Sequence, residues 1–306
     1  MTRTWLMPLL VGAITIGLAQ PADAQRRRDR DERMTRLDTT IALSRGGIVE
    51  LQGADGDMIV TGWDRDEVRI RATSEDGDLR LDATSSRVQL KSIGMGWGDV
   101  RYDVTVPFGT RMLLNGRSTD LSVRGTRGEV EAQTQNGDMV FADVTDVDIN
   151  SLNGDVEMQR VEGVRVNLVA GDVRIDGVSG AVEVVTVSGD VALRNSTTRG
   201  ISVNSTSGEL YFDGAIDPRG RYEFSSHSGS VVMRLPADVS AAVSLQTYSG
   251  DIESDFPIQL EGGATMGGHP RTFDFRIGNG GARITMRSFS GSVQLQRAGT
   301  SNPQED

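Results

Sequence analysis

Acidic residues recur at nearly constant spacing along the chain, in most cases directly after a glycine. The series is Asp120, Asp138, Asp155, Asp172, Asp190, Glu209 and Asp251. If these side chains stack, their carboxylates repel one another, and a hard cation such as Ca²⁺ relieves the repulsion through oxygen ligands. The spacing therefore makes Asp138, Asp155, Asp172 and Asp190 candidate calcium ligands.

The same acids have an alternative, purely structural role. In tight turns, Asp side chains accept hydrogen bonds from nearby backbone N–H groups. Serine replaces the acid at Ser230 and Ser292, and the spacing differs from that of calcium-binding nonapeptide repeats. Both facts favour the turn role, but the sequence leaves both roles open.

The acids, together with Ser230 and Ser292 at the equivalent positions, belong to an internal repeat, and we call each of these positions a mark. Neighbouring marks lie 17 to 21 residues apart, except for a gap of 41 residues between Asp251 and Ser292. Apolar residues recur eight and six residues before each mark and one and three residues after it. This alternation predicts two strands per repeat, each with one buried face. The long gap predicts a degraded copy or an insertion near residue 271.

A repeat of this length cannot bury its own apolar face, whereas stacked copies share a continuous core. The glycine before each mark can adopt the positive φ that a tight corner demands. The sequence therefore predicts an all-β fold. We expect a parallel β-solenoid, or β-helix, with coils of 17–21 residues and a less regular N-terminal β cap.

Hydroxyl side chains recur four residues before the marks. They are Thr134, Ser151, Thr186, Ser205, Ser226, Thr247 and Ser288. We expect an inward ladder in which these hydroxyls bond to one another or to the backbone. A catalytic serine array is the alternative, and the lack of accompanying basic residues argues against it.

The N-terminus has the features of a secretory signal peptide. Arg3 precedes an apolar stretch, and Ala22-Asp23-Ala24 forms a small-residue cleavage site. The chain has no cysteine, so it has neither disulfides nor the cysteine of a lipidated N-terminus. We expect a signal peptide at 1–24, a charged linker at 25–37, a capping region at 38–110, the solenoid at 111–297 and a disordered tail at 298–306.

Composition argues against several function classes. The net charge of −11 disfavours nucleic-acid binding. With two histidines, His227 and His269, and no cysteine, a zinc site is not expected. Neither histidine is paired with a nucleophile, and aromatic residues are few. We expect no enzyme activity, no cofactor and no membrane span after signal cleavage. The abundant acids keep a carbohydrate-active β-helix enzyme open as an alternative.

The aromatic residues of the N-terminal region have two possible roles. Trp63, Trp97 and Tyr102 are expected to pack over the open end of the solenoid. Alternatively, Trp97 lies within the glycine-flanked segment Gly94–Gly98, and an exposed tryptophan on such a loop suits ligand or partner contact. The sequence favours packing and leaves the binding loop open.

Three motifs occur in a fixed order. They are GDMIVTGWDRDEV at 56–68, VPFGT at 106–110 and GNGGARITMRSFSGSV at 278–293. Together they resemble the bacterial "putative adhesin" family over residues 38–297. The resemblance implies a β-solenoid in an exported envelope protein, and it supplies no catalytic or binding residues.

These observations lead to one expected function and one further alternative. We expect a non-enzymatic envelope protein, in the periplasm or at the cell surface, that acts in adhesion-like binding or as a scaffold. Its partner is an envelope or cell-surface macromolecule, either protein or polysaccharide. The alternative is a periplasmic structural or stress-related protein without an external ligand.

Overall fold

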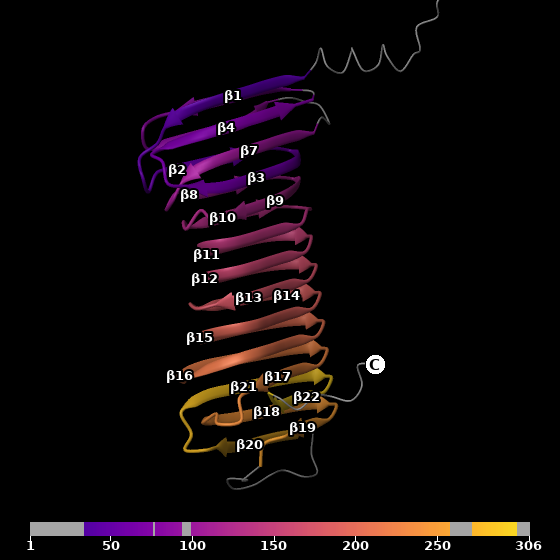
Figure 1. Ribbon diagram of the computed structural model, residues 1–306. Helices are drawn as coiled ribbons and strands as arrows, with labels where there is room; N and C mark the ends of the chain where they lie inside the picture. The colour runs from indigo at the N-terminus through magenta and orange to yellow at the C-terminus, as the bar shows by residue number, and fades with distance from the viewer. Residues whose placement is uncertain (1–33, 76, 94–98, 258–270, 299–306) are drawn as a thin grey trace, which may run out of the picture.

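The computed structural model describes residues 34–75, 77–93, 99–257 and 271–298. In these residues 22 strands join through backbone hydrogen bonds into one continuous sheet, which winds into a rod (Figure 1). None of the described segments is a helix capable of crossing a membrane. The predicted all-β solenoid is confirmed. The predicted signal peptide and most of the predicted linker and tail lie outside the described residues.

The middle of the rod consists of regular parallel coils. Its strands are β8 (Arg111–Asn115), β9 (Ser118–Arg124), β10 (Val130–Thr134), β11 (Met139–Asn153), β12 (Val156–Ala170), β13 (Val173–Val178), β14 (Val182–Ser188), β15 (Val191–Ser207) and β16 (Leu210–Ser228). The residues that follow the marks pair in register from coil to coil: Met139 lies opposite Val156, which lies opposite Val173. The register expected from the repeat is therefore the register of the sheet.

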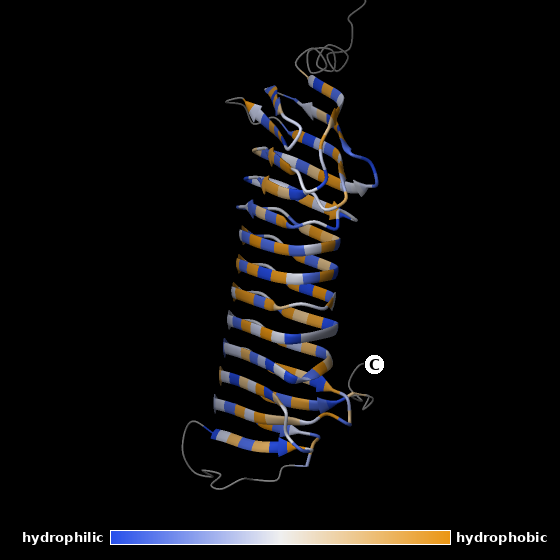
Figure 2. Cartoon of the chain, turned by 90° about the vertical axis from the view of Figure 1, so that its left-hand side faces the viewer, coloured by the Kyte–Doolittle hydropathy of each residue, from blue (hydrophilic) through white to orange (hydrophobic). Residues whose placement is uncertain are grey.

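The core is the shared interior of these coils. The residues one and three after each mark point inward, and Met139 and Phe141 are fully buried. Buried apolar side chains form one cluster from Leu43 to Leu295. Figure 2 shows the resulting alternation of apolar and polar residues along each strand. Burial of this apolar surface, at roughly 25 cal/mol per Å², is what stabilises coils that have no core of their own.

The glycine before each mark forms a corner at which coils touch through their backbones. The glycines have positive φ: 126° at Gly137, 125° at Gly154, 136° at Gly171, 128° at Gly189 and 132° at Gly208. A Cβ atom on Gly154 would lie 2.0 Å from the carbonyl oxygen of Gly137. Both the backbone conformation and the close approach therefore require glycine.

A second corner lies five residues after the mark and tolerates other residues. Asp143, Arg160 and Asn195 have φ values of 54°, 52° and 51° there. Arg160 donates to both carboxylate oxygens of Asp143 on the preceding coil, at 2.7 and 2.8 Å. These hydrogen bonds hold the pKa of Asp143 below its usual value. The ion pair thus links two coils at a corner where the backbone is strained.

At the N-terminal end, the first coil in sequence is not the first in space. The strands are β1 (Thr35–Ala42), β2 (Ile48–Gln52), β3 (Asp55–Trp63), β4 (Glu67–Ser74), β5 (Asp78–Ala83), β6 (Arg87–Ile93) and β7 (Val100–Pro107). The coil of β2 and β3 lies between β6–β7 and β8–β9, with parallel pairing on both sides. Asp57 lies opposite Asp120, so the repeat register extends into this region. Strands β1, β4 and β5 add antiparallel pairs.

The C-terminal end is interleaved in the same way. Its strands are β17 (Val231–Leu235), β18 (Ala241–Ser249), β19 (Ile252–Ser254), β20 (Arg271–Ile277), β21 (Ala282–Ser290) and β22 (Val293–Arg297). Strand β20 pairs antiparallel with β18, and the chain then returns so that β21 lies between β16 and β18. The last coil in sequence is therefore next to last in space (Figure 1). The sequence did not predict this order.

Substitution of a corner glycine tests the backbone contact between coils. Gly154→Ala should lower the free energy of unfolding by about 3 kcal/mol or more, because alanine is strained at this φ and its Cβ meets backbone. Gly200→Ala is the matched control, since a Cβ at Gly200 has no atom within 4 Å. Its effect should stay below about 1 kcal/mol. Equal losses in denaturant unfolding would contradict the role of the corner.

Candidate binding surface

The acids form a column along one edge of the rod, and each acid links two coils. The Oδ1 atom of each Asp accepts a hydrogen bond from the backbone N–H of the acid on the next coil. With the accepting side chain first and the donating backbone second, the pairs are Asp120 and Asp138 at 2.9 Å, Asp138 and Asp155 at 2.9 Å, Asp155 and Asp172 at 2.9 Å, Asp172 and Asp190 at 3.0 Å, and Asp190 and Glu209 at 2.7 Å. The turn role predicted a hydrogen bond within the corner of the Asp itself, whereas these bonds cap the corner of the next coil.

The structure brings the four candidate calcium ligands together in this column, one on each of four successive coils. Each uses its Oδ1 atom for a backbone hydrogen bond, and the Oδ2 atom of Asp172 also accepts a hydrogen bond from Arg174 at 2.8 Å. Within the described residues, no cluster of three or more His, Cys, Asp or Glu side chains is arranged to hold a metal ion. Calcium binding by Asp138, Asp155, Asp172 and Asp190 stays a prediction.

The hydroxyl ladder has the inward position expected from the sequence. Its members are buried, with 9% exposure or less. Thr134 donates to the carbonyl oxygen of Asn136 at 2.8 Å, and Ser288 donates to that of Gly229 at 2.9 Å. Thr134 and Ser288 thus bond to backbone carbonyls near the glycine corner, which is a structural role, whereas the buried Oγ atom of Ser226 has no hydrogen-bond partner among the described residues.

A column of exposed and mostly apolar side chains lies three residues before the marks, next to the acids. We call it the apolar ladder: Leu152, Val169, Val187, Thr206, His227, Phe289 and Tyr248, in spatial order. Leu152, Val187 and Phe289 are about half exposed, at 50%, 48% and 48%. Large apolar side chains in a row on a surface mark sites of interaction more often than isolated ones do.

Three aromatic rings stack at the C-terminal end of the ladder. The ring of Phe289 lies 4.8 Å from that of His227, with a 7° angle between their planes. On its other side it lies 4.8 Å from the ring of Tyr248, with a 6° angle. Because Phe289 is on the intercalated strand β21, the stack depends on the interleaved order of coils. His227 has the outward position expected for it.

Sequence reasoning missed this ladder, although part of it was detectable. Leu152, Val169 and Val187 occupy the same repeat position, and strict alternation places that position outside, next to the buried hydroxyl. The aromatic stack was not detectable, because the sequence order is His227, Tyr248, Phe289, whereas Phe289 is the middle ring in space.

A shallow groove of about 450 Å³ runs beside the aromatic end of the ladder. One wall is the ladder itself, from Thr206 to Tyr248. The other wall is formed by side chains two residues earlier, among them Asn204, Gln246 and Arg287. One apolar wall and one polar wall suit a ligand with both kinds of surface.

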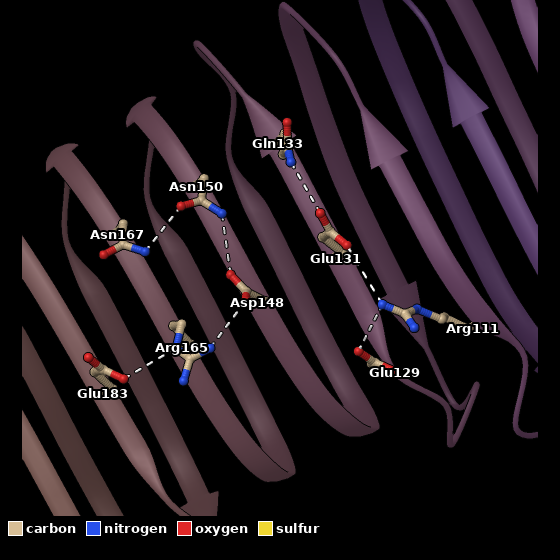
Figure 3. Close-up of polar contacts among 9 residues, drawn as sticks. All are labelled: Arg111, Glu129, Glu131, Gln133, Asp148, Asn150, Arg165, Asn167 and Glu183. Carbon is tan, nitrogen blue, oxygen red and sulfur yellow. Dashed lines mark hydrogen bonds and ion pairs between the residues drawn. The ribbon is translucent and has the colours of Figure 1, made fainter.

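Charged side chains lie beyond this polar wall, on the sheet of β10, β11, β12 and β14. Arg165 lies between two acids, 3.7 Å from Asp148 and 3.2 Å from Glu183. Asn167, two residues after Arg165 in the direction of the ladder residue Val169, donates to Asn150 at 3.1 Å. Figure 3 shows these contacts. A second groove, of about 620 Å³, contains these charged residues together with Glu129, Glu162 and Glu223.

The remaining candidates divide between the cap and the parts of the chain outside the described residues. Trp97, its loop at 94–98 and His269 lie outside them. Tyr102 is buried in the N-terminal core and donates to the carbonyl oxygen of Gln52 at 2.8 Å. Burial raises the pKa of its hydroxyl. Trp63 donates to the carbonyl oxygen of Glu67 at 2.7 Å. Both residues therefore have packing roles in the cap.

The order of motifs and the solenoid together agree with a known family. Residues 95–296, more than half of the chain, match Toastrack DUF4097. The chain belongs to this family. The membership confirms the family resemblance seen in the motifs. No curated protein matches this Toastrack chain.

Solved structures similar to the Toastrack chain have low sequence identity to it. A "putative adhesin" from Parabacteroides merdae is 8% identical, covers 86% of this chain and 96% of its own, and has a TM-score of 0.35. A "putative adhesin" from Bacteroides fragilis is 11% identical, with 85% and 97% coverage and a TM-score of 0.31. A "putative lipid binding protein" from Parabacteroides distasonis is 10% identical, with 85% and 96% coverage and a TM-score of 0.32.

Two substitutions of one acid separate its hydrogen bond from its charge. Asp155→Ala should lower the free energy of unfolding by about 1 kcal/mol, because the N–H of Asp172 loses its acceptor. Asp155→Asn keeps an acceptor oxygen and should lose less. Equal losses for both variants would show that the charge, not the acceptor, matters at this position.

The same variants test calcium binding. If the column has only the turn role, the melting temperature of the wild type is equal in EDTA and in millimolar Ca²⁺. A melting temperature that rises in Ca²⁺ for the wild type, but not for Asp155→Asn, would instead assign cation binding to the column.

Proposed function

We propose that this protein is an exported, non-enzymatic binding protein of the bacterial envelope and that the apolar ladder is its contact surface. The observation that carries the proposal is that five of the seven large apolar side chains exposed among the described residues lie in this one column: Leu152, Val169, Val187, Tyr248 and Phe289. Its partner is a macromolecule of the envelope or cell surface.

The ladder has the physical properties of a binding surface. It spans seven coils, and at ~4.8 Å per coil it is about 29 Å long. Every member is attached to a strand of the continuous sheet, so its position is set by backbone hydrogen bonds rather than by a loop. A partner therefore meets a surface that is already ordered, which reduces the entropy lost on binding.

Export is supported by the N-terminal sequence. The basic residue, apolar stretch and small-residue cleavage site within residues 1–24 have the order of a secretory signal. Stacked coils provide stability without disulfides, which suits a chain that has no cysteine. The proposed location is the periplasm or the cell surface.

A carbohydrate-active enzyme is the second candidate, and the charged groove favours it. That groove combines several acids with Arg165 on one face of the solenoid, as a glycoside-cleaving site requires. However, Arg165 forms ion pairs with Asp148 and Glu183, so neither carboxylate is set apart as a proton donor. Binding without catalysis is therefore the function we propose.

Retention on isolated envelopes tests the proposal. The purified mature chain should sediment with washed cell envelopes of its source bacterium. The triple variant Val187→Ser, Phe289→Ser, Tyr248→Ser should bind at least about tenfold more weakly, because three exposed apolar contacts are lost.

Ile93→Ser is the matched control, since Ile93 is 50% exposed and is not part of the ladder. Its retention should equal that of the wild type. The proposal fails if the wild type does not sediment, or if the triple variant sediments as well as the wild type while remaining folded.

A further inference from the structure

We propose that the surface around the apolar ladder binds a neutral polysaccharide chain that runs along the axis of the rod. This inference rests on the proposed function and specifies its partner. It comes from a second property of the surface, namely the near absence of charge.

Three neighbouring columns form this surface, which we call the uncharged strip. They lie five, three and two residues before the marks, on the eight coils from Asp138 to Asp251. The column at five contains Gln133, Asn150, Asn167, Val185, Asn204, Ser225, Arg287 and Gln246. The column at three adds Gln135 to the ladder. The column at two contains Asn136, Asn153, Ala170, Ser188, Ser207, Ser228, Ser290 and Ser249.

The strip carries less charge than the chain as a whole. Three columns on eight coils give 24 positions, and only Arg287 is Asp, Glu, Lys or Arg. In the whole chain, these four charged residue types make up 25% of the residues. On one side the strip borders the acid column. On the other it borders Glu131, Asp148, Arg165 and Glu183 on four coils, as Figure 3 shows for its amide edge, and Ser202, Glu223, Thr285 and Ser244 on the other four. A strip with a single charged residue, bordered by columns that carry several charges, favours an uncharged ligand.

The chemical groups of the strip match those of a sugar chain. Side-chain amides both donate and accept hydrogen bonds, and so do serine hydroxyls. The ladder between them offers apolar and aromatic contacts for the C–H groups of sugar rings. The groove of about 450 Å³ lies within the strip and combines the two, because its lining includes Asn204 and Gln246 as well as Phe289 and Tyr248.

The repeat also suits a polymer. Equivalent positions recur at every coil, ~4.8 Å apart, over seven steps and about 34 Å. In the column at five, five of the eight positions carry an amide: Gln133, Asn150, Asn167, Asn204 and Gln246. A linear chain of repeating units can make the same contacts again and again along this length. An acidic polymer would be repelled by the neighbouring acid column, and a purely apolar chain would leave the amides and hydroxyls without partners.

Affinity electrophoresis tests this inference. The mature chain is run through native gels that contain dextran, mannan, a β-glucan or, as an anionic polymer, polygalacturonate. At least one neutral polysaccharide should retard the wild type, and polygalacturonate should not. Retardation by none of the neutral polymers, or by polygalacturonate alone, would overturn the inference.

A matched pair of variants assigns the binding to the strip. Asn204→Asp with Thr206→Asp places two carboxylates on the strip and should weaken retardation at least about tenfold. Ser122→Asp with Gln159→Glu places two carboxylates away from the strip, on β9 and on the N-terminal part of β12. This variant should leave the retardation unchanged. Equal behaviour of the two folded variants would place the binding elsewhere and contradict the proposal.

Envelopes stripped with protease separate this inference from the proposed function. The wild type should still sediment with stripped envelopes, because their polysaccharides remain. If it sediments with intact envelopes only, the partner is a protein. The polysaccharide inference then fails, whereas the proposed binding function stands.

Discussion

The close approach of one coil to the next at the glycine corner is the constraint on which the rest of the structure depends. The corner glycines have positive φ, and any Cβ there would meet the backbone of the neighbouring coil. Because backbone meets backbone at this edge, the coils keep one register over the length of the rod. That register places the acid column, the buried hydroxyls and the apolar ladder in straight lines.

Interleaving at the two ends then determines which side chains become neighbours. At the C-terminal end, β21 and β22 enter between coils that are adjacent in sequence. This places Phe289 between His227 and Tyr248 and completes the aromatic part of the ladder. The first coil of the N-terminal region is enclosed in the same way. Each of these two coils therefore has parallel partners on both sides instead of forming an open end of the stack.

The sequence predicted the repeat, its register and its inward faces, because period-2 alternation and a fixed glycine report directly on local geometry. Met139, Phe141 and Thr134 are buried as expected. The order of coils was not predictable, because Ser230, Asp251 and Ser292 occupy equivalent repeat positions and fit either order. For the same reason the contact of Phe289 with both other rings was missed. The acid column was predicted as a column, but its hydrogen bonds to the next coil required the structure.

The interleaved order is the central claim of this account, because it builds the aromatic end of the binding surface. The chain has no cysteine, so engineered pairs report on neighbours without competition. The hydroxyl oxygens of Ser230 and Ser292 are 3.0 Å apart, whereas Asp251 lies one coil further on. The account predicts that Ser230→Cys with Ser292→Cys forms an intramolecular disulfide on mild oxidation and that Ser230→Cys with Asp251→Cys does not. A disulfide in the second pair but not in the first would contradict it.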